Sequence, residues 1–391
     1  MRYPIVYFHM LSVGFLLILG HSMLRSFLPI LAKELDPTGV LVGLTISSYF
    51  FARTFIELPS GFISDRIGRR TPIIVGLCLG VVGSLICTFS ASIYILIIGL
   101  TLWGLGAALF FTNNMALIID LFEPRVRGRA MGTFQGIEFI GSFAGAPIGG
   151  FLAEWLGYTS VFYVAGASIA MGLFIAITSR GLRKAGTWTT TRSTHISVRE
   201  SLNGLRNRGL LVTCITSLSR TLIAQGVIST VLPIYLHDFL NMSVGIIGMI
   251  VSMRTGGLCL ATATSGYISD KIGRKPVIFA GLFIESLCIY LYTLVGTFEL
   301  LILLAFADGL GVGMVSATLI ALMSEQVAPE YVGGSVGLYR TFMDIGAVTG
   351  PVLIVMVQMA FGIYSCFFFG AALLLVNIPI LTIAKERKKT Q

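Results

Sequence analysis

Apolar runs of about 20 residues or more, separated by short polar breaks, follow one another along almost the whole chain of 391 residues. A run of this length is what a helix needs to cross the hydrocarbon core of a membrane. The pattern predicts an all-α fold, a bundle of twelve transmembrane helices with six in each half of the chain. The predicted spans are residues 5–30, 40–62, 72–90, 93–121, 130–153, 159–179, 211–236, 245–267, 276–296, 299–326, 334–357 and 363–384.

The composition supports a membrane protein, because 55% of the residues are hydrophobic and only 12% are charged. A typical soluble domain has about 25% charged residues. The first run, Ile5 to Ile30, is longer than the apolar segment of a signal peptide and lacks a clear cleavage site. We therefore expect this run to stay in the protein as its first span.

One charged stretch occurs twice. Residues 61–70 read Gly-Phe-Ile-Ser-Asp-Arg-Ile-Gly-Arg-Arg, and residues 266–275 read Gly-Tyr-Ile-Ser-Asp-Lys-Ile-Gly-Arg-Lys. The same offset of 205 positions relates Pro124 to Pro329 and Gly157 to Gly362. The chain is therefore predicted to contain two copies of one unit. We expect pseudo-symmetric six-helix halves at residues 1–180 and 209–391, joined by a cytoplasmic linker at 181–208.

The net charge of +9 is explained by where the bases lie, without a nucleic-acid ligand. Lys and Arg gather in alternate predicted loops, at residues 66–70, 125–129, 180–208 and 271–275, and at the C-terminus. Basic loops stay on the cytoplasmic side of a membrane. This predicts a multi-pass protein of the cell (plasma or inner) membrane with both termini in the cytoplasm.

The repeated stretch has the form G-x-x-x-D-[RK]-x-G-R-[RK]. This form resembles the signature loop of the major facilitator superfamily of secondary transporters, and the resemblance covers essentially the whole chain. It implies two parallel six-helix halves that work by alternating access around a substrate site near the middle of the membrane.

The resemblance also implies a cytoplasmic gate. Gly61 and Gly68 would let the backbone approach closely, and Asp65 would meet the positive end of the helix that starts near Gly337 in the opposite half. Asp270 would do the same in reverse, near Gly132. The alternative is that these charges only fix the topology. The predicted gate residues are Gly61, Asp65, Gly266 and Asp270, together with the ion pairs of Arg69 with Asp120 and of Arg274 with Glu325.

Glycines of the fifth predicted span in each half point to one branch of the family. Those at positions 141, 145, 346 and 350 resemble a motif of drug:proton antiporters, although Ala146 stands where that motif has proline. The same glycines would equally serve close helix packing. A larger departure is Leu100, which replaces an arginine that the family's fourth-span motif links to proton coupling. If protons drive transport, other residues must handle them.

Ten charged residues fall inside the predicted spans, five acids and five arginines. A lone charge in the middle of a membrane is unfavourable, so we expect these residues to pair or to face a wet cavity. Arg53 and Glu57 lie one helical turn apart, as do Arg340 and Asp344, so both pairs are able to form locally. The ten residues are Arg25, Arg53, Glu57, Glu138, Arg220, Arg254, Glu285, Asp308, Arg340 and Asp344.

Four of these acids are candidates for proton coupling. We predict that Glu138 is the proton carrier, because its own helix places no base on the preceding turn, and that Asp344 is an ion-pair member beside Arg340. Asp308 is the reserve candidate, and Glu57 is the fourth. The alternative is that the acids merely pair with arginines across the bundle.

Polar residues within the spans are candidates for a substrate cavity. His21, matched in the other half by Gln225 if one residue is lost, is alternatively a satisfied polar core residue. Asn113 and Asn114 either bind substrate or tie helices together. Since five acids balance five arginines, the sequence predicts no substrate charge. The cavity candidates are His21, Arg25, Arg53, Asn113, Asn114, Arg220, Gln225, Arg254 and Arg340.

The sequence gives no sign of an enzyme. Residues 333–337 satisfy G-x-S-x-G, but a hydrolase needs a strand before that turn, and we find neither a metal-ligand cluster nor a phosphate-binding loop. We predict a monomeric transporter without cofactor or metal, whose partners are a small-molecule substrate, a proton and membrane lipid, with no nucleic acid. The leading interpretation is proton-coupled export of small amphipathic organic compounds, that is, multidrug efflux by an antiporter. The alternatives are uptake or exchange of a polar metabolite by a symporter or facilitator, and lipid translocation.

Overall fold

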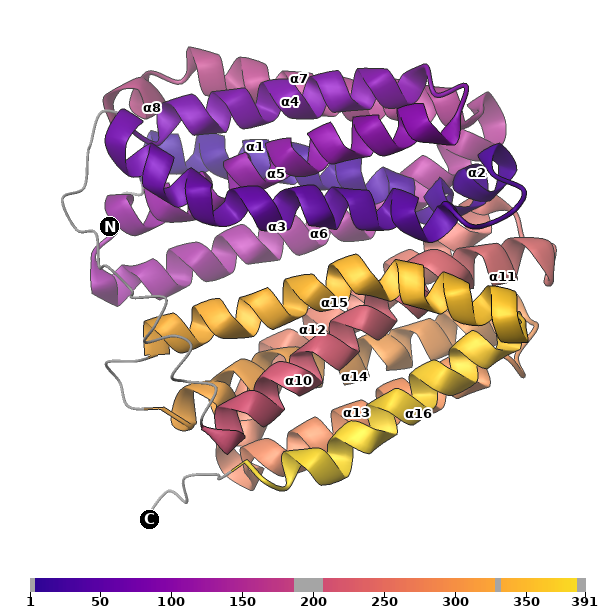
Figure 1. Ribbon diagram of the computed structural model, residues 1–391. Helices are drawn as coiled ribbons and strands as arrows, with labels where there is room; N and C mark the ends of the chain where they lie inside the picture. Colours follow the sequence, from indigo (N-terminus) through magenta and orange to yellow (C-terminus); the bar gives the residue numbers. More distant parts are fainter. Residues whose placement is uncertain (1–3, 186–206, 328–331, 385–391) are drawn as a thin grey trace. The chain divides into compact units, whose positions relative to one another are not determined.

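The computed structural model describes residues 4–185, 207–327 and 332–384. Within these ranges all regular secondary structure is helical, as the apolar pattern predicts (Figure 1). Most of the predicted linker and the basic C-terminal residues lie outside the described ranges. Contacts divide the chain into two compact units, the first made of Met1–Ser193 and Met242–Ser252, the second of Thr194–Asn241 and Met253–Gln391.

The helices of the first half of the chain lie where the predicted spans lie, with additional short helices after the first and last of them. They are α1 (Ile5–Met23), η1 (Leu24–Ser26), α2 (Leu28–Leu35), α3 (Val42–Ile67), α4 (Arg70–Thr88), α5 (Ile93–Leu121), α6 (Pro124–Leu156), α7 (Tyr158–Thr178) and α8 (Arg180–Ala185).

The helices of the second half repeat this order. They are α10 (Arg208–Ile223), η3 (Ala224–Val231), α11 (Leu232–Asp238), α12 (Val244–Ile272), α13 (Arg274–Leu291), α14 (Phe298–Glu325), α15 (Val332–Phe361) and α16 (Ile363–Leu381).

Ten helical segments of the described chain are long and apolar enough to cross a membrane. The helices α3 and α13 are not among them, although both lie where spans are predicted. Arg53 and Glu57 lower the mean hydropathy of α3, and α13 has only 18 residues, among them Arg274, Lys275 and Glu285. The chain is therefore an all-helical, multi-pass membrane protein, and the count of twelve spans remains a prediction.

The first membrane helix of each half is interrupted, which the apolar pattern does not reveal. The helix α1 passes into the 3-10 helix η1 shortly before Pro29, and α10 passes into the π-helix η3 shortly before Pro233. Proline has no N–H to donate, and its ring crowds the preceding turn. The chain accommodates each proline by changing the winding of the helix, more tightly in the first half and more widely in the second.

Glycines bring helices of each unit into close contact. A Cβ atom built on Gly76 of α4 would lie 2.6 Å from the carbonyl oxygen of Gly106 in α5. In the second unit, a Cβ atom on Gly281 of α13 would lie 2.8 Å from the carbonyl oxygen of Gly311 in α14. Both positions leave no room for a side chain, so these helix pairs pack backbone to backbone.

The fifth-span glycines have the same effect. A Cβ atom on Gly145 of α6 would lie 2.7 Å from the carbonyl oxygen of Leu19 in α1. Gly350 of α15 likewise lies against the carbonyl oxygen of Leu222 in α10. These contacts confirm the packing interpretation of the motif, while its relation to antiport stays untested.

The signature stretch is mostly helix and only briefly a turn. The helix α3 continues to Ile67, so Gly61 lies inside it, and no described atom comes within 4 Å of a Cβ atom built there. Within its own unit Gly61 makes no close approach, and the predicted approach to the opposite half stays untested. Gly68 makes the turn with a φ of 85°, as does Gly273 in the second copy with a φ of 102°, a conformation that favours glycine because it has no Cβ.

Candidate functional site

Each signature stretch is tied to the end of a long helix by an ion pair. Arg69 Nε lies 3.2 Å from Asp120 Oδ2 at the end of α5. In the second unit, Arg274 Nε lies 3.2 Å from Glu325 Oε1 at the end of α14. Both predicted pairs are present, and their role as a gate remains a prediction.

A serine supports the arginine in each copy. The guanidinium of Arg69 donates to Ser64, and Arg274 Nη1 donates to Ser269 Oγ at 2.6 Å. Asp270 Oδ1 also lies 2.7 Å from Arg274 Nη2, within its own unit. The side chain of Asp65 lies outside the described part of the structure, so the predicted contact of these acids with the opposite half stays untested.

Arg53 of α3 is the centre of the charges in the first unit. Its Nε lies 2.5 Å from Glu57 Oε1, as the one-turn spacing predicts. Its guanidinium also interacts electrostatically with the half-buried Glu138 of α6. The helix of Glu138 supplies no base on the preceding turn, but the fold brings Arg53 to it from another helix. Glu138 therefore belongs to one charged group with Arg53 and Glu57.

A buried aromatic group lies beside these charges. The His21 ring stacks on Tyr49 with centroids 4.4 Å apart and meets Trp103 edge-on at 6.2 Å. Arg25 and Arg53 are close enough to His21 to interact with it electrostatically. His21 Nδ1 and Trp103 Nε1 are buried and have no hydrogen-bond partner among the described residues. His21 is therefore not a fully satisfied core residue, because its Nδ1 lacks a hydrogen bond among the described residues.

The two asparagines of α5 differ. Asn113 Nδ2 donates to Ser60 Oγ of α3 and to the Leu109 carbonyl oxygen, each at 2.7 Å, so Asn113 ties two helices together. Asn114 is fully buried, and in the described part of the chain neither of its amide atoms has a partner. Asn114 is therefore the stronger substrate candidate of the two.

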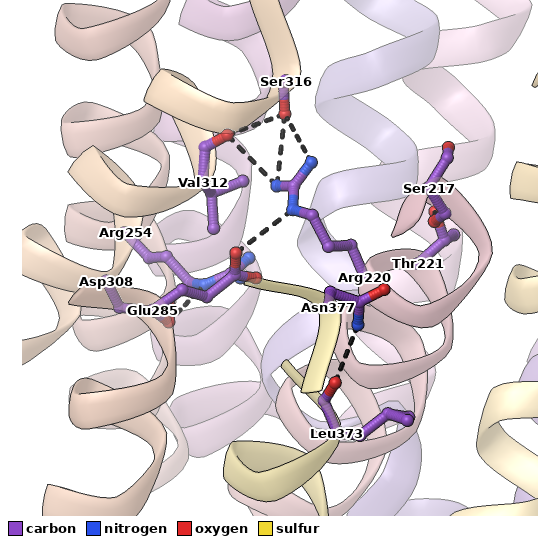
Figure 2. Close-up of polar contacts among 10 residues, drawn as sticks. All are labelled: Ser217, Arg220, Thr221, Arg254, Glu285, Asp308, Val312, Ser316, Leu373 and Asn377. Carbon is purple, nitrogen blue, oxygen red and sulfur yellow. Dashed lines mark hydrogen bonds and ion pairs between the residues drawn. The ribbon is translucent and has the colours of Figure 1, made fainter. Parts of the chain in front are cut away.

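Three buried charges and the partly buried Arg254 form one network in the second unit (Figure 2). Arg220 of α10 places Nε 3.2 Å from Glu285 Oε2 of α13. Arg254 of α12 places Nε 2.6 Å from Asp308 Oδ2 of α14. Arg254 also interacts electrostatically with Glu285, which links the two pairs. The network thus joins two positive and two negative charges from four helices.

The network is shielded from solvent, with Glu285 1% exposed and Asp308 0% exposed. Even so, three of its polar atoms, Glu285 Oε1, Asp308 Oδ1 and Arg254 Nη2, have no hydrogen-bond partner among the described residues. Buried polar groups in native proteins are nearly always hydrogen-bonded. The three atoms leave the network able to form further hydrogen bonds.

Polar side chains surround Arg220 (Figure 2). Its two Nη atoms each lie 3.3 Å from Ser316 Oγ, and Nη2 also donates to the Val312 carbonyl oxygen at 3.1 Å. Asn377 of α16 donates from Nδ2 to the Leu373 carbonyl oxygen at 2.7 Å. Arg220 is therefore held firmly by α14 as well as by Glu285.

The remaining predicted candidates are Arg340, Gln225 and Arg25. Arg340 is exposed, and its predicted local pair with Asp344 stays a prediction. Gln225 lies in the π-helix η3, and Arg25 Nη1 donates to Ser142 Oγ of α6 at 3.3 Å. Within the described ranges, no group of His, Cys, Asp and Glu side chains is arranged to hold a metal ion.

The sequence reasoning missed Tyr49 and Trp103 as site residues and left Glu285 without a role. The repeat could have identified Tyr49 and Trp103. At the offset of 205 positions, Tyr49 corresponds to Arg254 and Trp103 corresponds to Asp308. The fold shows the same equivalence. A glycine follows Trp103 and Asp308 in each copy, and it packs against the carbonyl oxygen of Tyr49 in one unit and of Arg254 in the other.

The chain matches the Major Facilitator Superfamily twice, at residues 10–224 and 209–391. Multidrug resistance protein MdtG of Escherichia fergusonii is 28% identical over 371 residues, which cover 91% of this chain and 88% of that protein. An uncharacterized MFS-type transporter of Methanocaldococcus jannaschii is 26% identical over 362 residues, covering 91% of this chain and 92% of that protein.

Solved structures share the fold. A mutant of the nucleoside transporter NupG has a TM-score of 0.79 at 14% identity, and the match covers 96% of this chain and 100% of that one. A bacterial homolog of the human lysosomal transporter Spinster, inward-facing and unoccupied, also has a TM-score of 0.79, at 15% identity, with 98% of this chain and 96% of that one covered. At these identities the likeness concerns the fold alone.

Proposed function

Because the chain belongs to the major facilitator superfamily, whose members are transporters and not enzymes, we propose that it is a twelve-span secondary transporter working by alternating access. In this proposal it sits in the cell membrane with both termini in the cytoplasm. It exports small amphipathic organic compounds in exchange for protons, so that the proton gradient drives the export.

The observation that carries this proposal is the likeness to the multidrug resistance protein MdtG along 91% of the chain. The likeness runs through both units and therefore includes the helices that hold the buried charges and the aromatic group. The fifth-span glycines, which resemble the drug:proton antiporter motif, agree with it.

The first unit offers groups that suit an amphipathic organic substrate. The rings of Tyr49 and Trp103 present apolar surface, and the unpartnered Nε1 of Trp103 and Nδ1 of His21 are available for a hydrogen bond. Mostly apolar sites with a few polar groups are typical for such ligands. We assign substrate binding to these three residues together with Asn114.

Proton coupling needs an acid whose protonation changes its contacts. Leu100, at the place of the family's coupling arginine, is buried and apolar. Glu138 lies near Arg53, and a proton on Glu138 would release the hold of its carboxylate on that arginine. We therefore assign the proton-carrying role to Glu138.

Uptake or exchange of a polar metabolite is the second candidate function, and the network of the second unit favours it. Arg220 and Arg254 are charge-assisted donors of the kind that bind carboxylates. The unpartnered Nη2 of Arg254 is free to make such a bond. A polar or anionic substrate would use this network, whereas an apolar one would not.

Transport by purified protein in liposomes separates the two functions. The vesicles are given a pH gradient or none, and movement of labelled cationic, neutral and anionic compounds is measured in each case. Net movement of amphipathic compounds against their concentration gradient, only when a pH gradient is present, is the expected result. Gradient-independent exchange restricted to polar compounds would overturn export and support the second candidate.

A further inference from the structure

The two arginines of the buried network are held very differently. Arg220 uses Nε for Glu285 and both Nη atoms for α14, through Ser316 and the Val312 carbonyl oxygen. Arg254 makes a bond from Nε to Asp308 at 2.6 Å, while its Nη2 is buried without a partner in the described part of the chain. Arg220 is therefore a fixed anchor, and Arg254 has donor capacity to spare.

The two acids complete this asymmetry. Glu285 binds Arg220 with Oε2 and keeps Oε1 buried and unpartnered. The same residue interacts electrostatically with Arg254, so Glu285 is linked to both arginines. A spare donor on Arg254 and a spare acceptor on Glu285 thus lie in one network, ready for a bond that the described state does not make.

We infer that Arg254 changes partner from Asp308 to Glu285 when Asp308 takes up a proton. The inference rests on the proposed function, since it gives this proton a place in the transport cycle. In the exchange an O–H bond forms on Asp308, and the bond from Arg254 Nε to Asp308 Oδ2 breaks. A bond from Arg254 Nη2 to Glu285 Oε1 replaces it. Loss of the proton reverses each step.

The surroundings of Asp308 favour it as the acceptor of the proton. Arg254 of α12, Glu285 of α13 and Arg220 of α10 interact with it electrostatically, as do Cys288 and Tyr292 of the α13 region. From α15, Tyr339 faces Arg220 and Ser217. If Glu285 took the proton, the anchored Arg220 would lose its acid. If Asp308 takes it, Glu285 still serves both arginines, one with each oxygen.

The exchange changes which helices are tied together. With Asp308 ionised, Arg254 links α12 to α14, and with Asp308 protonated, it links α12 to α13. Arg220 holds α10 to α13 and α14 in both states. Asp308 is thus assigned as a second proton-coupling residue, and Glu285 as a positioning residue that receives Arg254.

Two measurements without substrate test the exchange. Infrared spectra of the reconstituted protein report a protonated carboxyl group, which is titrated in wild-type protein, in Asp308→Asn and in Glu285→Gln. The matched control is Glu299→Gln, at an exposed acid in the first turn of the same helix α14. We expect the titrating band to vanish in Asp308→Asn and to persist in the control. In Glu285→Gln its midpoint should move to lower pH by about one unit, a tenfold change in proton concentration, because protonated Asp308 would leave Arg254 without an acid.

The second measurement is a high-resolution structure of Asp308→Asn, which mimics the protonated acid. Arg254 Nη2 should lie within hydrogen-bond distance of Glu285 Oε1, and an Arg254 that stays on position 308 overturns the exchange. If that variant does not fold, structures of wild-type protein at acidic and alkaline pH give the same comparison. A wild-type protein that shows no pH-driven transport refutes the proposed function. Driven transport combined with an unchanged Arg254, or with a band that persists in Asp308→Asn, refutes only the exchange.

Discussion

The first unit holds Tyr49 and Trp103 where the second holds Arg254 and Asp308, on helices that pack against each other in the same way. In the first unit the pair stacks around His21, and in the second it forms an ion pair of 2.6 Å. The glycine that follows each of Trp103 and Asp308 keeps the two backbones equally close. The comparison teaches that the repeat sets the backbone contacts, while the side chains at the same positions are free to take up different chemistry.

The ends of the helices show the opposite behaviour. Arg69 pairs with Asp120 and Arg274 with Glu325 at equal N–O distances of 3.2 Å. Here both the backbone and the chemistry are alike in the two units. The two units are thus alike at the ends of these helices and differ in the side chains that meet in the middle.

Removing the charge of Glu138 tests the proton-carrying role proposed for the first unit, and it should have the largest effect on transport. Glu138→Gln is expected to abolish pH-driven transport, because the side chain no longer binds and releases a proton, and to spare exchange that moves no net proton. Both are measured in proteoliposomes. The control is Glu123→Gln, at an exposed acid just before α6. Transport against a gradient at the wild-type rate and pH dependence would show that Glu138 is not the coupling residue.

Breaking one ion pair in each unit sharpens the contrast between a buried network and a partly exposed pair. Arg220→Met leaves Glu285, which is 1% exposed, without its anchor, and should lower the free energy of unfolding by about 3 to 5 kcal/mol. Arg53→Met breaks a pair whose arginine side chain is 36% exposed, and should change it by at most about 1 kcal/mol. Thermal unfolding in detergent measures both. Equal losses would mean that the network is no more than a set of ordinary pairs.

Filling a glycine contact tests whether close packing holds the backbone frame that the units share. Gly145→Ala places Cβ 2.7 Å from the Leu19 carbonyl oxygen and should cost about 1 to 3 kcal/mol of stability. Gly136→Ala on the same helix meets no described atom within 4 Å and should be neutral or stabilising by up to about 1 kcal/mol, since alanine favours a helix. The unfolding temperatures of the two variants and of the wild-type protein measure this difference in stability. A fully stable Gly145→Ala would remove the packing interpretation.

The loop before α3 offers the smallest effect and contrasts with its copy in the second unit. Hydrogen bonds from the Thr38 hydroxyl and from the Leu41 N–H lower the pKa of Asp36 below its usual value. Asn241, which does not titrate, stands at the equivalent position. Because the folded pKa is the lower one, the stabilisation is present above about pH 4 and is lost as the pH falls through the folded pKa.

Hydrogen exchange of the Leu41 N–H, which donates to Asp36 Oδ2 at 2.8 Å, measures this loss. Relative to Asp36→Asn at the same pH, exchange of this N–H in the wild-type protein should become faster as the pH falls through the folded pKa of Asp36. N–H groups next to Asn241 should show no such step. The same step in both loops would mean that the whole fold loosens with acid and that Asp36 has no particular part in it.

Sequence alone determined the class of the protein. The long apolar runs, the basic loops and the repeat at an offset of 205 positions predicted an all-helical membrane protein built from two copies of one unit. Such a prediction is possible because the membrane requires long apolar helices whatever their neighbours are. The ion pairs of Arg69 and Arg274 followed from the resemblance to the family's signature loop, which places an acid at Asp120 and Glu325. The one-turn spacing also predicted the pair of Arg53 with Glu57.

Only the tertiary structure decided how the remaining charges are grouped. Arg220, Arg254, Glu285 and Asp308 lie on four helices, and no spacing along the chain shows that their side chains meet. Sequence likewise did not show that Arg53 interacts with Glu138, that Asn113 Nδ2 ties two helices together, or that prolines interrupt the first helix of each half. The physical reason is that hydrophobic length and local turns are properties of one helix. The partners of a buried charge depend on which faces of several helices are turned toward each other.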